Sequence, residues 1–428
     1  MGKRILITSI PSWNQRSGAN TFSTLFEKFD SNDLANLYIR PEIPDSTVCS
    51  RYFNIREWQV VRSLFKRGTI TGFEVNRATG NETRELDYEQ KKTNHYSRNR
   101  KIIYLWMREL AWKLGRWKSK ELNEFLDDFN PEVLVFSIEP YPYFNRINEY
   151  IIKKCKPKKI IGYLWDDNFT YKQFPNNIPY IVERFFLRKQ VRRLVSSCTQ
   201  VLAISPKMKE ECDREFGINS ILLTKPLREN NIPPYQYKGG VIRLLYTGSL
   251  AIGRDKVLKA VAQAVNKVNT DVIKMQLDIY TNTPICKEYQ QEINTNKGCK
   301  LYGAIPQSQV FIEQENSDIL IFGESLEVGN NVARLSFSTK VTDYLSSYRC
   351  ILAIGPDDNS SIDYFRREDA AIVCKKEEDI LGSLFKINEN PQILAEYAEK
   401  AHCCGVKNHN PKAIDLTLRN LIGYSSLN

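Results

Sequence analysis

Two segments in the second half of the chain join an apolar strand to residues that could bind phosphate. In the first, LLYTGSLAIGRDKVLKAV, the apolar run ends at Thr247 and continues through Gly248 and Ser249 to Arg254, where a helix begins. Gly248 lets the backbone approach a ligand closely, and a cation beside a helix N-terminus suits phosphate oxygens. An ordinary strand-to-helix turn with a solvated arginine is the alternative interpretation.

The second segment, RLSFSTKVTDYLSSYRCILAIGP, places small hydroxyl side chains where a helix starts. Ser338 or Thr339 could cap the free backbone N–H groups, which would bind an anion together with Lys340. Asp343 can share a helix face with Lys340 and hold ribose hydroxyls. A capped helix with an exposed Lys–Asp pair is the plainer alternative. Neither segment has the glycine pattern of a P-loop or of a dinucleotide-binding turn.

Carboxylates follow two apolar strands in the first half of the chain. Asp166 and Asp167 come directly after KKIIGYLW, and Glu139 lies in FSIEPYPY. Side chains at the carboxyl ends of parallel strands line a ligand crevice, where a carboxylate could orient a substrate hydroxyl or act as a base. Strand-end acids that cap a turn would give the same pattern. Gly18 and Asn20 open the first helix, where their backbone could approach a substrate or form a plain turn.

The elements that would position these residues alternate between strands and helices. In the first half, strands are expected at 3–10, 132–138, 158–165 and 200–205. Helices are expected at 101–126, 144–154 and 180–196 and after residue 205. Residues 30–100 are polar and predict loops and short helices. The alternation is typical of a doubly wound α/β domain.

The second half repeats this alternation after a linker at 226–240, which is rich in Pro and Gly. Apolar strands such as MQLDIYTN, DILIFG and RCILAIG alternate with helices expected near 254–268, 284–296, 307–315 and from 338. The sequence therefore predicts two Rossmann-like α/β domains, at 1–225 and 241–410. A C-terminal helix at 411–428 could pack back on the first domain.

Composition excludes several classes of protein. The 428 residues are 42% hydrophobic, and no apolar run reaches the roughly 18 residues of a membrane-spanning helix. The start MGKRILITSI reads as a strand rather than a signal peptide. Ten cysteines at irregular spacing and three histidines favour reduced thiols in the cytoplasm over a zinc site or disulfide framework.

The net charge of +11 lies in the first half alone. Residues 1–225 carry 38 Lys and Arg against 26 Asp and Glu, whereas residues 226–428 carry 23 against 24. Such asymmetry indicates an anionic partner for the first half. Nucleic acid is not expected, because the basic residues are spread over helices without a recognisable nucleic-acid motif.

One basic helix of the first half has two interpretations. Its apolar residues Ile103, Trp106, Leu110, Leu114 and Trp117 recur at helical spacing among many Lys and Arg. A basic helix of this kind could lie on an anionic membrane leaflet. The interpretation favoured here is that the stripe packs on the sheet and leaves the basic face in solvent.

Together, the two phosphate-binding segments resemble those of GT-B glycosyltransferases, in particular glycosyltransferase family 4 members that build bacterial surface polysaccharides. The resemblance covers the second half in order, including GAIPQSQVFIEQENSDILIFGES, and reaches the first half through VLAISPKMKEECDREFG. It implies that a nucleotide-sugar donor is held by the second domain and an acceptor by the first. By position, Gly248, Ser249, Arg254, Ser338, Thr339 and Lys340 would face the donor diphosphate, and Asp343 the ribose.

The chain departs from this family pattern at two places. Many members carry two Glu separated by seven residues; Asp343 matches the later one, but the earlier position is Leu335. Glu324 and Glu327 lie upstream and could substitute. Many members also have a cleft histidine where this chain has Asp166 and Asp167.

The predicted function is transfer of a sugar from a nucleotide diphosphate to a glycan or lipid-linked acceptor. The resemblance implies retention of configuration, a role in surface polysaccharide synthesis, and no metal or other cofactor. The candidate catalytic residues are Asp166, Asp167, Lys340 and Arg254, and the residues expected toward the acceptor are Gly18, Asn20 and Glu139.

The expected location is cytoplasmic, with contact to the inner membrane face left open. The alternatives are a GT-B nucleotide-sugar epimerase and a non-catalytic subunit of a polysaccharide assembly complex.

Overall fold

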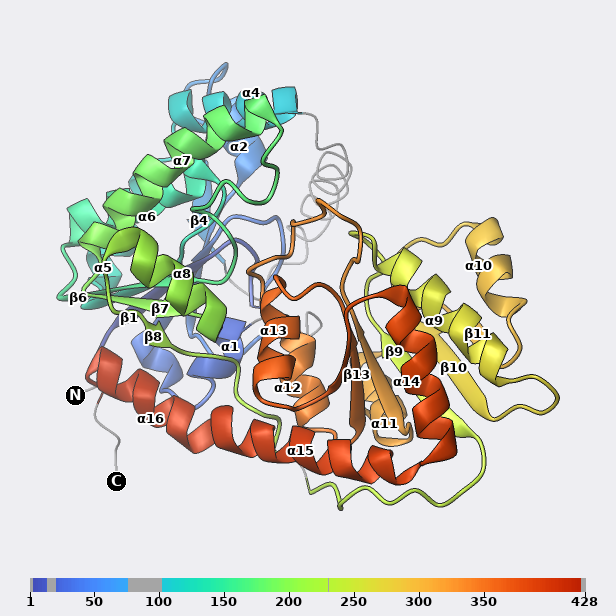
Figure 1. Ribbon diagram of the computed structural model, residues 1–428. Helices are drawn as coiled ribbons and strands as arrows, with labels where there is room; N and C mark the ends of the chain where they lie inside the picture. The colour runs from blue at the N-terminus through green and yellow to red at the C-terminus, as the bar shows by residue number, and fades with distance from the viewer. Residues whose placement is uncertain (1–2, 14–20, 76–101, 230, 425–428) are drawn as a thin grey trace.

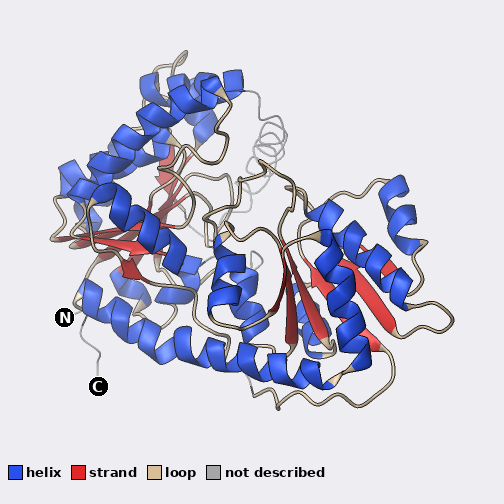
Figure 2. Ribbon diagram, in the orientation of Figure 1, coloured by secondary structure: helices blue, strands red, loops and turns tan. Residues whose placement is uncertain are grey.

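The computed structural model describes residues 3–13, 21–75, 102–229 and 231–424 (Figure 1). These residues form two lobes, each built on a sheet that is flanked by helices (Figure 2). The prediction of two Rossmann-like α/β domains is confirmed. The predicted site residues Gly18 and Asn20 lie outside the described residues.

The first lobe contains a sheet in the order β4-β3-β2-β1-β5-β6-β7-β8, in which β4 is antiparallel to its neighbour and the other pairs are parallel. Its strands are β1 Ile5–Ser9, β2 Leu34–Tyr38, β3 Arg51–Ile55, β4 Gly72–Glu74, β5 Val133–Ser137, β6 Lys159–Leu164, β7 Gln200–Ala203 and β8 Ile221–Leu222. β1, β2 and β5 are buried along their whole length, as expected for parallel strands covered on both faces.

Three of these strands lie where the sequence predicted only loops and short helices. The prediction for 30–100 is wrong for β2, β3 and β4 because polar residues interrupt the apolar pattern of the first two strands. Asn36 Nδ2 donates to the carbonyl of Ile7 at 3.1 Å, and Asn54 Nδ2 donates to the carbonyl of Arg40 at 2.9 Å. A buried amide that is satisfied by backbone carbonyls can occupy an interior strand.

Helices α1, α2 and α4 to α8 flank this sheet. They span α1 Thr21–Phe26, α2 Glu57–Arg62, α4 Ile102–Leu114, α5 Lys120–Phe129, α6 Pro142–Cys155, α7 Ile178–Ser197 and α8 Pro206–Phe216, with a short 3-10 helix at Ser31–Asp33. The single helix expected at 101–126 is divided into α4 and α5. The break follows from Ser119, which caps α5 by accepting a hydrogen bond from the backbone N–H of Leu122 at 3.2 Å.

The buried face of helix α4 is not the face that carries its apolar stripe. Trp112 is fully buried and donates from Nε1 to Glu57 at 3.1 Å. Trp106, Leu110 and Leu114 are exposed. The interpretation that this stripe packs on the sheet is therefore wrong for these three residues, because Trp112 on the opposite side supplies the buried contact.

The second lobe contains a parallel sheet in the order β11-β10-β9-β12-β13-β14. Its strands are β9 Ile242–Thr247, β10 Met275–Tyr280, β11 Cys299–Tyr302, β12 Ile319–Gly323, β13 Cys350–Ile354 and β14 Ile372–Cys374. Its helices are α9 Arg254–Val268, α10 Lys287–Asn294, α11 Gln307–Glu315, α12 Thr339–Leu345, α13 Ser360–Arg367 and α14 Glu377–Glu389. This strand order is the doubly wound one, in which the ligand crevice opens where the order reverses, between β9 and β12.

The chain crosses between the lobes twice. After β8 it passes through the segment before β9, and it returns through α15 Gln392–Asn408 and α16 Pro411–Ile422. Helix α16 lies along the first lobe, as Figure 1 shows, where Arg419 donates to the carbonyl of Lys28 at 2.6 Å. One buried hydrophobic cluster contains residues of the first lobe, the second lobe and α16, so the lobes share part of their core.

Candidate active site between the two lobes

The carboxyl ends of strands from both sheets meet between the lobes. Ser336, in the segment between β12 and α12, donates a hydrogen bond to Asp166, which follows β6. Gln173 donates to the carbonyl of Val332 at 3.0 Å, and Asn331 donates to the carbonyl of Lys172 at 3.0 Å. These contacts place the predicted donor and acceptor residues on opposite sides of one junction.

Lys340 and Gly248 lie together at the reversal point of the second sheet. A Cβ built on Gly248, whose φ is 150°, would lie 3.0 Å from Lys340 Nζ. The ammonium also lies 4.6 Å from the ring centroid of Tyr246 and 5.5 Å from that of Phe322. The close approach requires a residue without a side chain at position 248.

Lys340 has no carboxylate partner among the described residues within ion-pair distance of its ammonium. Burial lowers the pKa of Lys340 to about 8, and the positive charge of Arg254 acts in the same direction. A half-buried ammonium beside another cation is unfavourable in the empty protein. An anion bound against Gly248 would stabilise the charge, which makes this the best candidate phosphate position in the molecule.

Arg254 is held by Glu324 rather than left free. Its Nη2 lies 2.9 Å from both carboxylate oxygens of Glu324, and its Nε lies 3.2 Å from one of them. Glu324 directly follows β12, so this pair joins the two strand ends of the crevice. A similar close approach occurs at Gly253, where a Cβ would lie 2.4 Å from Ser325 Oγ. Glu324 thus fixes the guanidinium at the edge of the candidate phosphate position.

The other predicted donor residues lie nearby with partners of their own. Ser249 Oγ accepts from the backbone N–H of Ala251 at 3.1 Å, and Ser338 Oγ accepts from that of Lys340 at 3.3 Å. Thr339 begins α12. Asp343 forms an ion pair with Lys225 at 2.8 Å. Lys225 comes from the segment after β8, so Asp343 faces the connection between the lobes.

Two carboxylates lie at the ends of neighbouring strands of the first sheet. Glu139 follows β5 and is buried, and Asp166 follows β6. Burial raises the pKa of Glu139 to about 7, and the negative charge of Asp166 adds to this shift. Burial also raises the pKa of Asp166, which accepts the hydrogen bond from Ser336. Glu139 can therefore gain and lose a proton near neutral pH.

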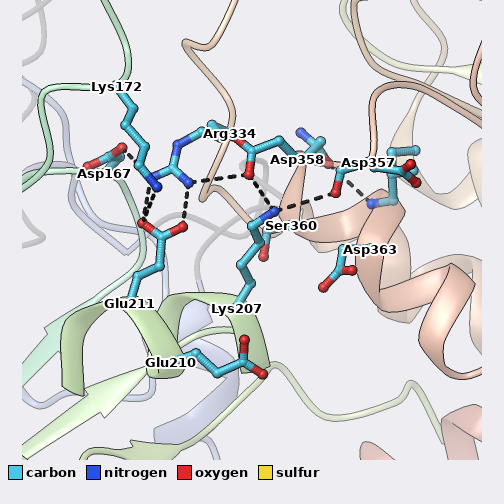
Figure 3. A network of polar contacts seen from close by, with 12 residues as sticks. Asp167, Lys172, Lys207, Glu210, Glu211, Arg334, Asp357, Asp358, Ser360 and Asp363 are labelled. Carbon is cyan, nitrogen blue, oxygen red and sulfur yellow. Dashed lines mark hydrogen bonds and ion pairs between the residues drawn. The ribbon is translucent and has the colours of Figure 1, made fainter. Parts of the chain in front are cut away.

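Asp167 has a structural environment that differs from that of Asp166. Its carboxylate is fully buried and accepts from the backbone N–H of Thr170 at 2.9 Å and from Arg334 Nη2 at 3.0 Å. Arg334 also bonds Glu211 of α8, at 2.5 Å and 2.8 Å (Figure 3). This environment is that of the turn-capping alternative, in which the Asp167 carboxylate is occupied by Thr170 and Arg334.

The cluster around Arg334 continues across the lobe junction through one ion pair and one buried hydrogen bond. Lys207 of α8 pairs with Asp358 at 2.6 Å (Figure 3). The buried hydroxyls of Ser205 and Ser360 lie 2.6 Å apart. Burial alone would lower the pKa of Arg334, but its hydrogen bonds to Glu211 and the charges of both carboxylates raise it. Arg334 therefore stays charged and ties α8 and the loop after β6 to the second lobe.

A pocket adjoins Glu324 on the side that faces Arg334. Its cavity volume is about 40 Å³. The lining residues are Ile252, Glu324, Ser325, Asn330, Asn331, Ala333, Arg334, Pro356, Asp358 and Asn359. The asparagine amides and the Glu324 carboxylate are groups that can hydrogen-bond hydroxyls.

Sequence reasoning missed two residues of this site. Arg334 was overlooked because its partners, Asp167 and Glu211, are distant in sequence. Lys225 was overlooked because it stands at the edge of the predicted linker. Glu324 was considered only as a substitute for a family residue, although its place directly after an apolar strand was a usable signal.

Comparisons with known proteins identify the fold. No protein-family model and no curated protein matches the sequence. Solved structures do match: sucrose-phosphate synthase from Thermosynechococcus elongatus has a TM-score of 0.63 at 10% identity, with 98% of each chain covered. Anabaena HepE, in complex with UDP and glucose, has a TM-score of 0.60 at 8% identity, with 98% of this chain and 99% of that one covered.

A third structure, that of TarM, matches with a TM-score of 0.52 at 13% identity. That match covers 70% of this chain and 57% of the TarM chain. At such identities the likeness concerns the fold alone. With a mostly parallel sheet in each lobe and 98% of the chain matched, the fold is that of the GT-B glycosyltransferases.

Proposed function

We propose that this protein is a glycosyltransferase that moves a sugar from a nucleotide diphosphate to an acceptor hydroxyl, with no resident cofactor. The observation that carries the proposal is Lys340, whose half-buried ammonium has no carboxylate partner in the described residues and lies against Gly248 at the reversal point of the second sheet. Phosphate is a ligand that suits such a position. HepE, which has the same fold, is described in complex with UDP and glucose.

On the donor side, Lys340 and the backbone at Gly248 bind the diphosphate. Arg254, oriented by Glu324, lies beside them and stabilises the charge that develops as the glycosidic bond breaks. Ser249, Ser338 and Thr339 border the same position. Asp343 holds the ribose hydroxyls with Lys225 as its neighbour.

On the acceptor side, Glu139 and Asp166 orient the hydroxyl that attacks the anomeric carbon. The acceptor oxygen bonds the anomeric carbon on the same face from which the diphosphate oxygen leaves, so the configuration is retained as that bond breaks. Because the pKa of Glu139 is about 7, its carboxylate can take up the hydroxyl proton near neutral pH. The resemblance noted in the sequence supports retention of configuration, with a glycan or lipid-linked acceptor in bacterial surface polysaccharide synthesis at the cytoplasmic membrane face.

The test is nucleotide binding followed by turnover. The purified chain is heated with UDP, GDP, CDP, ADP or TDP, and a ligand at one hundred times its dissociation constant should add about 2.7 kcal/mol of stability. The sugar form of the stabilising nucleotide is then supplied with candidate acceptors, and NMR of the product reports the anomeric configuration.

Each outcome discriminates between the proposals. Binding and transfer support the glycosyltransferase, and an inverted product removes retention from the proposal. Binding with interconversion of the donor sugar would indicate an epimerase, and binding without any reaction would indicate a non-catalytic subunit. If no nucleotide stabilises the chain, the donor site is refuted.

A further inference from the structure

The first lobe exposes large apolar side chains on two neighbouring helices. On α4 these are Trp106, Met107, Leu110 and Leu114, and on α7 they are Ile178, Val182, Phe185 and Phe186. Phe186 is 64% exposed and Leu114 is 62% exposed. On each helix the positions lie on one face, since they recur three, four or eight residues apart. Isolated exposed apolar residues are common, but two adjacent stripes of this size indicate an interaction surface.

The two helices lie at the same end of the lobe. Figure 1 shows α2, α4 and α7 together there, on the side away from α16. Both helices bond α6: Arg146 of α6 pairs with Glu109 of α4, and Arg193 of α7 pairs with Glu149 of α6 at 3.4 Å. Phe65 follows α2 and is 88% exposed; a hydrogen bond of 2.9 Å from the backbone of Arg116 to Ser63 fixes that segment beside the end of α4.

The charge on these helices has one sign where it reaches solvent. The exposed charged side chains of α4 and α7 are Lys113, Lys189, Arg192 and Arg193. The acidic residues of the two helices, Glu109 and Glu183, are only partly exposed. Arg116 and Lys118 add two exposed positive charges directly after α4. Lys189 Nζ lies 4.4 Å from the ring centroid of Phe185, so cationic and apolar groups are interleaved.

We propose that the exposed faces of α4 and α7, with Phe65, form a surface that docks on an anionic phospholipid bilayer. The apolar side chains would enter the interface between headgroups and acyl chains, and the Lys and Arg would contact the headgroups. No helix within the described ranges is long and apolar enough to cross a bilayer, so the contact is peripheral. A second protein copy would not account for the uniform positive charge, because like charges would then face each other.

The docking surface is connected to the acceptor side of the candidate site. The segment after Asp166 leads directly into α7, and Arg184 of α7 donates to the backbone carbonyl of Asp167 at 2.5 Å. Docking through α7 therefore holds the acceptor side of the junction near the membrane. This part of the inference rests on the proposed function, because it assigns the acceptor to the class of lipid-linked molecules.

The experiment measures binding of the full chain to vesicles, without donor or acceptor. Vesicles of equal parts phosphatidylcholine and phosphatidylglycerol are compared with vesicles of phosphatidylcholine alone by sedimentation. The wild type should bind the anionic vesicles, and the double substitution Phe185→Ser with Phe186→Ser should weaken binding at least ~10-fold. Lys113→Gln and Lys189→Gln should each weaken it about five-fold. The control, Val272→Ser with Ile273→Ser, changes two exposed apolar residues of the other lobe and should bind as the wild type does.

The proposal is overturned if the wild type does not sediment with anionic vesicles, or if the phenylalanine double variant binds as well as the wild type. Equal binding to both vesicle types would remove the electrostatic part and overturn the proposal as stated. Sedimentation velocity tests the other occupant: a wild-type dimer that the phenylalanine substitutions dissociate would assign the surface to a second copy. Vesicle binding is measured without nucleotide. A negative result in the vesicle assay therefore refutes the docking proposal and leaves the nucleotide-binding test unaffected.

Discussion

Replacing Lys340 with methionine tests whether its ammonium binds the donor phosphate. A charge-assisted hydrogen bond is worth roughly 1.5–3 kcal/mol, so Lys340→Met should weaken binding of the nucleotide diphosphate roughly 10- to 150-fold. Titration calorimetry measures the dissociation constant directly. Lys256→Met is the matched control, because Lys256 is an exposed lysine of α9 that pairs with Glu327 at the surface.

The same substitution should not destabilise the empty protein. The pKa of Lys340 is lowered from 10.5 to about 8, so its charge costs the folded state up to about 3 kcal/mol at neutral pH. A lysine whose folded pKa is lowered destabilises the fold while both states are protonated, and this cost disappears as the pH rises from 8 toward 10.5. Lys340→Met should therefore be more stable than the wild type at neutral pH, with a smaller difference in alkali.

The pH dependence of binding gives an independent readout. A bound diphosphate would raise the pKa of Lys340, so binding above pH 8 requires uptake of a proton. The affinity of the wild type should fall roughly ten-fold between about pH 7 and about pH 9, and that of Lys340→Met should stay nearly constant. The reasoning is refuted if Lys340→Met binds the nucleotide within two-fold of the wild type, or if it keeps the alkaline loss of affinity.

Three further substitutions test other parts of the site. Glu139→Gln should remove the rise in transfer rate between pH 6 and pH 8 and lower the rate at pH 8 by ~10²-fold or more, measured by product formation, with nucleotide affinity unchanged. Arg334→Met leaves the buried carboxylate of Asp167 without its ion-pair partner and leaves Glu211 with Lys172 alone, so it should cost about 3–5 kcal/mol in urea unfolding, which a wild-type unfolding curve would contradict. Gly248→Ala places a methyl group 3.0 Å from Lys340 Nζ and should abolish nucleotide binding, whereas Gly303→Ala, which meets no atom within 4 Å, should bind normally.

The sequence determined the architecture because apolar strands and amphipathic helices are local patterns. MQLDIY, ILIFG and CILAI formed β10, β12 and β13 as predicted, and the helix expected at 254–268 is α9. Because these patterns are local, the sequence also located Gly248, Arg254 and Lys340 after strands or at helix starts, where parallel sheets bind ligands. Strands β2 and β3 escaped prediction because Asn36 and Asn54 are compatible with a buried strand only once backbone carbonyls from elsewhere accept hydrogen bonds from their side-chain NH2 groups.

Only the tertiary structure decided what each polar side chain faces. Asp166 and Asp167 are adjacent in sequence and equally suited to catalysis by type, and both bond the second lobe, yet Asp166 accepts from the Ser336 hydroxyl whereas Asp167 is fully buried in an ion pair with Arg334. The outward direction of the apolar stripe on α4 likewise depends on Trp112 and its contact with Glu57. Strand and helix patterns are set by neighbours within a few residues, whereas ion pairs and burial depend on groups that the fold brings together from distant parts of the chain.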